Sequence, residues 1–430
     1  MPLALSQRTL DDIIWTCSIT ILACTWVSVH PNMPGINDNK LMVWLRRLEL
    51  MIWAILAPEM IIFWSLRQWL GARRLAKKYE EFIDYQGSKW SMTHGFFIQM
   101  GGLVMAGKSR TEILCPEKLE ILTREGAIRF PNIDQEDIQD KSKGDGFSKG
   151  MAILQTFWFM AQCLTRKIEG LPITQLEIFT AAFTALNGVM YFLWWDKPLD
   201  VRRPMYVEVV DTKTAYFSKL PSIATCLSGN NLYTSRYEER RVNDEFENEV
   251  SKETDGELAL NGSKHPILSH LSFIFDRLGQ MRSFSTTPPS VLSSKEVRMP
   301  TFYACAGDAT DVVLCHFIVS MIAMAFGAIH CLAWSFQFSS FTEKMLWRIC
   351  SVIILIIPLV FAIIISLALI QARTGMRVFS ARISKMANLV LPPLYLVARL
   401  VLLVEAFLEL RHLPSKAFSA VDWTSYIPHL

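Results

Sequence analysis

Seven blocks of apolar residues, separated by polar segments, constrain this chain more than any other feature. An α-helix needs roughly 20 mostly apolar residues to cross the roughly 30 Å hydrocarbon layer of a bilayer. The blocks reach or approach that length and comprise residues 13–29, 48–70, 151–163, 173–195, 312–334, 346–369 and 389–408. The sequence therefore predicts an all-α fold, a polytopic membrane helical bundle of about seven transmembrane helices.

The composition supports a membrane protein and excludes several other classes. Hydrophobic residues make up 51% of the 430 residues, more than is usual for a soluble chain. A net charge of only +3 leaves no footprint for a nucleic-acid partner. The nine cysteines and eight histidines show no spacing that resembles a zinc site. We therefore expect membrane lipids around the chain, and neither nucleic acid, metal nor cofactor bound to it.

The apolar blocks divide the chain into three parts. Residues 1–205 form an N-terminal membrane region with four spans and a cytoplasmic segment at about 79–150. Residues 206–300 form a polar loop, highly charged in its middle and rich in Ser, Thr and Pro near its end, which predicts partial disorder. Residues 301–430 form a C-terminal membrane region with three spans.

Basic residues predict the orientation, because loops rich in Lys and Arg remain in the cytoplasm. Such residues follow the second, fourth and sixth blocks: Arg73, Arg74, Lys77, Lys78, Lys197, Arg202, Arg203, Arg373, Arg377, Arg382 and Lys385. This bias predicts a cytoplasmic N-terminus and, with seven spans, a C-terminus on the opposite side. We expect a multi-pass protein of the endoplasmic reticulum.

Glu59 is the most informative single residue. It lies near the middle of the second block, directly after Pro58. A carboxylate at that depth is costly and commonly functional, and a buried carboxyl can keep its proton near neutral pH. Such an acid in an apolar cavity could start a carbocation cyclisation. The alternative is structural: Glu59 pairs with an arginine, or bonds to the carbonyl that Pro58 leaves without its N–H partner.

Further polar residues accompany Glu59 as candidates. Asp196 and Glu177 are candidates to assist catalysis, and the substrate-binding candidates are His94, Asn187, Trp195 and Arg399. Arg399 has Glu59 and Glu177 as candidate partners across the bundle. Each residue also has a structural interpretation, namely a bond between helices or, for Asp196 beside the tryptophans, a position at the membrane interface.

Several segments resemble a large fungal family of polytopic integral membrane proteins. They are TWVSVHPNMP, APEM, WSLRQWLGARR and WSMTHGFFIQMGG, then IQDKSKGDGFSKG, LQTFWFMAQC and LPITQLEIFTAAFTALNGVMYFLWWDKPLDVRRP. The resemblance is close over residues 15–205 and loose over the C-terminal spans, and the long charged loop departs from it. This family is similar to the membrane-bound terpene cyclase type of the ascofuranone pathway. The resemblance implies a metal-independent, proton-initiated cyclisation of a lipophilic isoprenoid or meroterpenoid, beside other pathway enzymes in the same membrane.

Two functions therefore remain open at the level of sequence. The first is an isomerase- or lyase-type terpene cyclase in fungal secondary metabolism, in which Glu59 donates the proton and Asp196 or Glu177 assists. The second is a transporter or channel, because Pro58, Pro358 and Pro392 break apolar helices that also carry acids. No internal repeat supports the second function. A pocket open to lipid favours the enzyme, whereas a continuous polar path favours transport.

Overall fold

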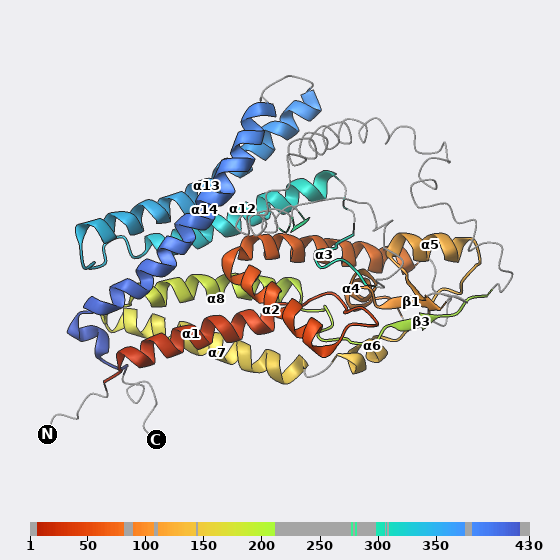
Figure 1. Ribbon diagram of the computed structural model, residues 1–430, viewed down its shortest axis with the longest axis horizontal. Helices are drawn as coiled ribbons and strands as arrows, with labels where there is room; N and C mark the ends of the chain where they lie inside the picture. Colours follow the sequence, from red (N-terminus) through yellow and green to blue (C-terminus); the bar gives the residue numbers. More distant parts are fainter. Residues whose placement is uncertain are drawn as a thin grey trace, which may run out of the picture.

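The chain folds into a bundle of long helices with a small mixed unit at one end (Figure 1). The computed structural model describes residues 7–80, 89–106, 111–142, 145–210, 277, 280–281, 298–305, 307, 309–374 and 381–421. The predicted polar loop, residues 206–300, lies almost wholly outside these residues. The fold is mostly helical, as the sequence predicts.

The bundle contains α1 (Leu10–Ser28), α2 (Lys40–Leu56), α3 (Pro58–Tyr79), α7 (Asp145–Ile168), α8 (Gln175–Leu193), α12 (Ala309–Cys331), α13 (Phe341–Thr374) and α14 (Ala381–Leu408). Within the described residues, five helices have the length and apolar composition to cross a membrane: α1, α8, α12, α13 and α14. The consecutive pair α2 and α3 makes a sixth if it counts as one span. The structure thus supports a multi-pass bundle but does not reach the predicted seven.

The predicted second span, residues 48–70, is broken. Helix α2 ends at Leu56, α3 begins at Pro58, and the two helices meet at a bend of 114°. Proline suits the first position of a helix, because the missing N–H is not needed there. Glu59 is therefore the second residue of a new helix and not a residue in the middle of a straight one.

Both outer ends of this bent pair lie at the same end of the bundle. Arg47 in the first half of α2 forms an ion pair with Asp200, just beyond the C-terminal end of α8. Lys78 near the end of α3 pairs with Glu120 of the mixed unit. In Figure 1 the bend itself lies partway along the bundle, so α2 and α3 enter it and turn back.

The described residues nearest the two ends of the chain meet at the other end of the bundle, called here the terminal end (Figure 1). Gln7 forms a β-bridge with Ser419, and the backbone N–H of Arg8 donates to the carbonyl of Phe418 at 2.8 Å. Two short 3₁₀ helices, Glu409–His412 and Ser415–Phe418, lead the chain there. The predicted placement of the termini on opposite sides of the membrane is therefore wrong.

The mixed unit consists of α4 (Met92–Gln99), β1 (Leu103–Ala106), β2 (Thr111–Ile113), α5 (Pro116–Arg124), α6 (Gln135–Lys141) and β3 (Met205–Val207). Its sheet has the order β2–β1–β3, with β1 antiparallel to β2 and parallel to β3. Val104 faces Ile113 on one side and Tyr206 on the other. The apolar block at residues 94–106 thus forms the buried centre of this unit, and the strands were not predicted.

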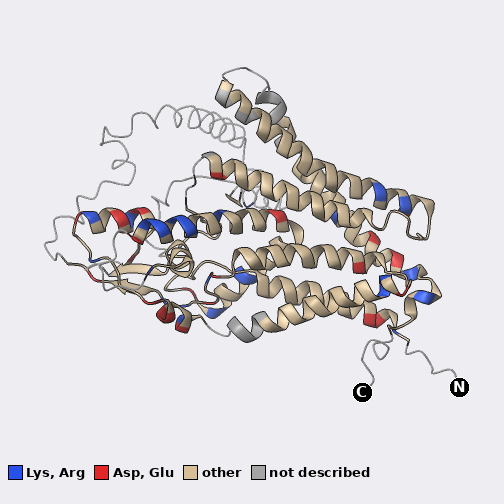
Figure 2. Cartoon of the chain, turned by 180° about the vertical axis from the view of Figure 1, so that it is seen from behind, with Lys and Arg blue, Asp and Glu red and all other residues tan. Residues whose placement is uncertain are grey.

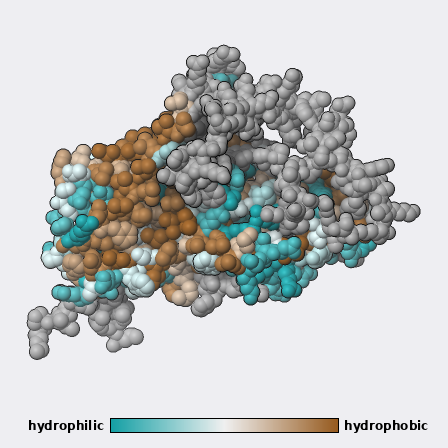
Figure 3. All heavy atoms as spheres, in the orientation of Figure 1, coloured by the Kyte–Doolittle hydropathy of each residue, from teal (hydrophilic) through white to brown (hydrophobic). Residues whose placement is uncertain are grey.

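The surface of the bundle is suited to lipid. Large apolar side chains point outward from it, including Trp15 and Phe157, which are 68% and 71% exposed. On the face shown in Figure 3, apolar residues form a broad surface on the bundle, and charged residues gather mostly at the two ends of the molecule (Figure 2). Helix α7 lies beside α1 and exposes Met151, Leu154 and Leu164, although its composition does not meet the criterion for a span.

Candidate functional site

A buried ion pair links the bent pair of helices to the C-terminal part of the bundle. The Nη1 group of Arg399 donates to both carboxylate oxygens of Glu59, at 2.7 and 2.9 Å. The hydroxyl of Tyr395 donates to the same carboxylate at 2.7 Å. Glu59 and Arg399 are only 7% and 2% exposed. Three charge-assisted hydrogen bonds therefore converge on one carboxylate inside the bundle.

Local sequence explains why these groups meet. Pro58 starts α3, so Glu59 lies in the first helical turn, where the helix dipole favours a negative charge. Tyr395 and Arg399 are four residues apart on α14 and therefore lie on one helix face. Both side chains can reach Glu59 at once. The sequence offered Glu59 as a partner of Arg399, and the structure shows that pair.

Aromatic rings surround the guanidinium of Arg399. Its central carbon lies 4.1 Å from the centre of the Phe326 ring and 4.7 Å from that of Phe183. Such contacts stabilise a cation most where water is excluded. The Nε and Nη2 groups of Arg399 have no hydrogen-bond partner among the described residues. Arg399 can therefore still donate to an additional oxygen.

Sequence reasoning missed two polar groups of this site, Tyr395 and His330, and His330 lies near the same rings. Its ring centre lies 4.5 Å from that of Phe326, and its Nδ1 is 2.9 Å from the carbonyl of the same residue. That contact requires the proton on Nδ1, which leaves Nε2 as an acceptor. Nε2 has no partner among the described residues. His330 could have been found as a lone histidine within an apolar run, and Tyr395 by its spacing of one helical turn from Arg399.

Glu177 and Asn187 serve the packing of α8. Glu177 accepts the backbone N–H of Thr174 at 2.8 Å, which caps α8, and it pairs with Arg8 at 2.5 Å. Asn187 accepts from Ser28 at 2.9 Å and donates to Thr25 at 3.3 Å, which joins α8 to α1. No described hydrogen bond or ion pair connects either residue to Glu59.

Asp196 and Trp195 are both exposed beyond the end of α8, and the Trp195 side chain is 55% exposed. Asp196 lines an open depression together with Trp69, Arg73 and Lys77. The structure does not bring these two residues to the buried ion pair, and their surroundings fit the interface position that the sequence offered as an alternative.

His94 has a structural environment. Its Nδ1 accepts the backbone N–H of Ser91 at 3.1 Å, so its Nε2 donates to the carbonyl of Ile133 at 2.9 Å. The ring stacks on Trp90 with centres 5.2 Å apart. Burial lowers the pKa of His94, while the Ile133 carbonyl and Asp134 act in the opposite direction. His94 therefore holds α4 in the mixed unit.

Lys197 departs most from the sequence reasoning, which placed it in an exposed basic loop. It is 1% exposed, and its Nζ donates to the carbonyl of His30 at 2.6 Å and to Gln68 and Asn32 at 2.9 and 3.2 Å. The rings of Trp64 and Trp194 lie 4.9 Å from the same nitrogen. Burial lowers the pKa of Lys197 well below its usual value. The three donors are all used, which makes this a fixed junction between the bundle and the mixed unit.

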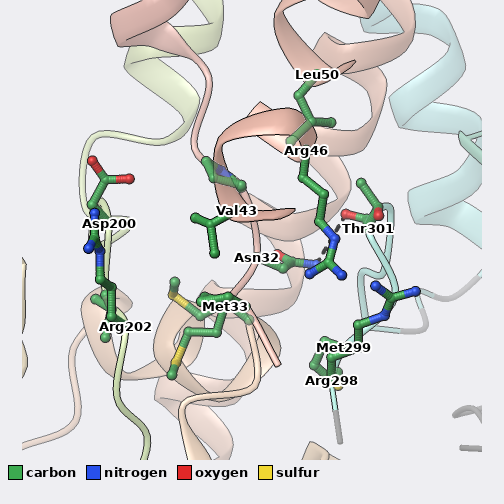
Figure 4. Close-up of a pocket in the computed structure, with 14 residues that line it drawn as sticks. Asn32, Met33, Val43, Arg46, Leu50, Asp200, Arg202, Arg298, Met299 and Thr301 are labelled. Carbon is green, nitrogen blue, oxygen red and sulfur yellow. Dashed lines mark hydrogen bonds between the residues drawn. The ribbon is translucent and has the colours of Figure 1, made fainter. Parts of the chain in front are cut away.

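A pocket lies between α2 and the mixed unit, and it is lined by three arginines: Arg46, Arg202 and Arg298 (Figure 4). It encloses about 630 Å³ of atom-free space, part of it open to solvent. Arg46 forms an ion pair with Asp38. Asp200 also lines the pocket, which does not include Glu59 or Arg399.

Comparison with known proteins places the chain only in a family. The pattern of a family of unknown function, DUF8562, matches residues 5–266 and 310–430. Neither a curated protein nor a solved structure matches the chain.

Proposed function

The chain belongs to the family of unknown function DUF8562, and we propose that it is a membrane enzyme that cyclises a lipophilic isoprenoid or meroterpenoid. The observation that carries this proposal is the buried group of Glu59, Tyr395 and Arg399. In it, Nε and Nη2 of Arg399 have no partner among the described residues and lie beside two aromatic rings. Hydrogen-bond donors in apolar surroundings are what an acid-catalysed cyclisation requires. The resemblance to membrane-bound terpene cyclases points the same way.

The ion pair changes the role that the sequence suggested for Glu59. A carboxylate that accepts three hydrogen bonds has no proton of its own to give. It can still take one from a carbocation, because a C–H group beside a cationic carbon is a strong acid. In the proposed reaction Tyr395 protonates an epoxide or carbonyl oxygen, and Arg399 stabilises the phenolate that remains. The substrate cation closes its ring and loses a proton from carbon to Glu59. That proton returns to Tyr395 along their 2.7 Å hydrogen bond, so the product is an isomer of the substrate.

The proposed membrane arrangement differs from seven spans. Helices α1, α7, α8, α12, α13 and α14 cross the bilayer, and α2 with α3 forms a re-entrant pair in place of the predicted second span. An even number of crossings fits termini that meet at one end, and the exposed apolar face of α7 supports its inclusion. Basic residues favour the mixed unit for the cytoplasmic side, which places Gln7 and Ser419 on the opposite side and reverses the predicted cytoplasmic N-terminus. The endoplasmic reticulum remains the proposed location, with pathway enzymes as neighbours.

The test uses microsomes from yeast that express the chain. Prenylated phenols and their terminal epoxides are supplied, and products of unchanged mass but new retention time are measured by chromatography and mass spectrometry. We expect Glu59→Gln and Tyr395→Phe to lower the rate ~10²-fold or more, as for other acid–base groups. Asp196→Asn removes an exposed acid and should leave the rate unchanged. No conversion of any substrate in the panel, or full activity in Glu59→Gln, would refute the proposal.

Transport is the second candidate, because a re-entrant pair with a charged residue at its tip is also how carriers build a binding site within the bilayer. Here α3 starts with Pro58 and Glu59 inside the bundle. The purified protein in sealed liposomes distinguishes the two functions. An enzyme returns an isomer on either side of the vesicle wall, whereas a carrier accumulates the unchanged compound in the lumen.

A further inference from the structure

Three glutamates from different parts of the chain converge at the terminal end of the bundle. Glu343 lies in the first turn of α13, Glu405 near the end of α14, and Glu409 begins the 3₁₀ helix that follows. One carboxylate oxygen of each lies within 4.8 Å of the others. This group is separate from the buried pair of Glu59 and Arg399.

Lysine and arginine side chains of the described residues do not balance the negative charges of this group, although His412 acts on Glu409. In the described part of the chain, no ion pair joins any of the three to a lysine or arginine. Glu343 accepts from the hydroxyl of Ser340 at 2.8 Å, and Glu409 accepts from the backbone N–H and hydroxyl of Ser339 at 3.1 and 3.2 Å. These neutral donors orient two of the carboxylates but leave their repulsion in place.

Glu405 provides an independent sign of a missing partner. Its side chain is only 5% exposed. Its Oε2 is buried and has no hydrogen-bond partner among the described residues. Its carboxylate points toward Glu343 and Glu409, which offer only further negative charge. A buried carboxylate oxygen without a partner is costly, so the position favours a bound cation.

We propose that Glu343, Glu405 and Glu409 bind one Ca²⁺ ion. Calcium takes carboxylate oxygens at roughly 2.3–2.6 Å, so two ligands on opposite sides of the ion stand about 5 Å apart. Separations of up to 4.8 Å fit that limit. Magnesium needs shorter bonds in a near-octahedral array and usually takes one or two carboxylates. An all-oxygen set also favours a hard cation over zinc or copper.

The ion would link separate segments at the terminal end of the bundle and stabilise that end. Its ligands come from the start of α13, the last turn of α14 and the 3₁₀ helix that follows α14. The following residues already contact the N-terminal half of the bundle, because Arg166 donates to the carbonyl of Ser419 and Arg8 to that of Ala417, both at 2.7 Å. Calcium binding should therefore make this corner harder to unfold, whatever reaction the interior site performs.

The experiment measures Ca²⁺ binding to the full chain in detergent micelles after treatment with a chelator. Isothermal titration with calcium chloride should show one saturable site, and the thermal-unfolding midpoint should rise as calcium is added. Glu405→Gln keeps the shape of the side chain and should weaken Ca²⁺ binding at least 10-fold. Glu136→Gln makes the same chemical change on exposed α6 of the mixed unit and serves as the control.

A proton shared among the carboxylates is the competing explanation, and the same variants test it. Without calcium, Glu405→Gln should unfold at a higher temperature than the wild type, because one of three like charges is removed. With saturating calcium the order should reverse. Wild-type protein that shows no saturable calcium binding, binds only zinc, or binds calcium no more tightly than Glu405→Gln overturns the proposal.

Discussion

Replacing Arg399 by methionine should destabilise the protein by about 3–5 kcal/mol, the usual cost of removing one partner of a buried ion pair. Methionine fills similar space but deletes both hydrogen bonds from Nη1 to Glu59. It also removes the cation that lies on the rings of Phe183 and Phe326. Tyr395 then remains as the single described donor to a carboxylate that is 7% exposed. Glu59→Leu should cost a comparable amount by leaving the Arg399 charge without its partner.

The double variant distinguishes the cost of an unpaired buried charge from the cost of lost packing. Two apolar residues in place of a buried ion pair are often neutral or even stabilising. Glu59→Leu with Arg399→Met should therefore be more stable than either single variant, with a coupling energy of about 3 kcal/mol or more. Unfolding in micelles with increasing dodecyl sulfate, followed by tryptophan fluorescence, gives the four free energies. Additive effects, or single variants that each cost less than about 1 kcal/mol, would show that the pair contributes little.

Three further predictions concern other parts of the fold. The folded-state pKa of His94 lies below the usual value of 6.5. As the pH drops below 6.5, the unfolded chain therefore takes up the proton before the folded chain does, and the stability of the fold should fall. His94→Asn should lose that pH dependence of the melting temperature. Lys197→Met removes one donor from the His30 carbonyl, Gln68 and Asn32, although Gln68 still accepts from Trp194 and Asn32 from Gln68. The change should cost about 1–3 kcal/mol in the same unfolding assay, whereas an unchanged midpoint would contradict a fixed junction. Epitope tags on the two termini should show equal protease access in sealed microsomes, because Gln7 and Ser419 pair, and opposite access would refute the arrangement.

Apolar block length predicted most of the bundle, because a long helix in lipid must satisfy its backbone internally and be apolar outside. The same rule failed at residues 48–70, where α2 and α3 together are long enough to cross but bend by 114°. Pro58 was visible in the sequence, but a proline can kink a span or start a new helix. Here Pro58 starts a new helix, and ion pairs from Arg47 and Lys78 to residues distant in the sequence stabilise the resulting bend.

The sequence predicted the site only where a single residue, by its position, implies a free-energy cost of burying its charge. Glu59 and Arg399 stood out because charge in an apolar run needs a partner, and the structure supplies each to the other. Lys197 was misplaced because its sequence neighbourhood is that of a basic loop, whereas the Trp64 ring and the His30 carbonyl that enclose it come from distant segments. Glu343 and Glu405 lie 62 positions apart, so no spacing rule joins them.

The bent helix pair and the buried ion pair depend on each other. A helix that ends inside the bundle leaves backbone groups that water cannot reach, so the break must be enclosed by protein. The start of α3 offers a positive dipole there, and Glu59 places its charge next to it. One carboxylate in lipid would still be too costly, and Arg399 of α14 supplies the compensating charge. Nε and Nη2 of Arg399 nevertheless find no acceptor in the part of the chain that the structure describes. A bundle under selection for stability alone has no reason to retain such donors, and a ligand with an oxygen atom gives it one.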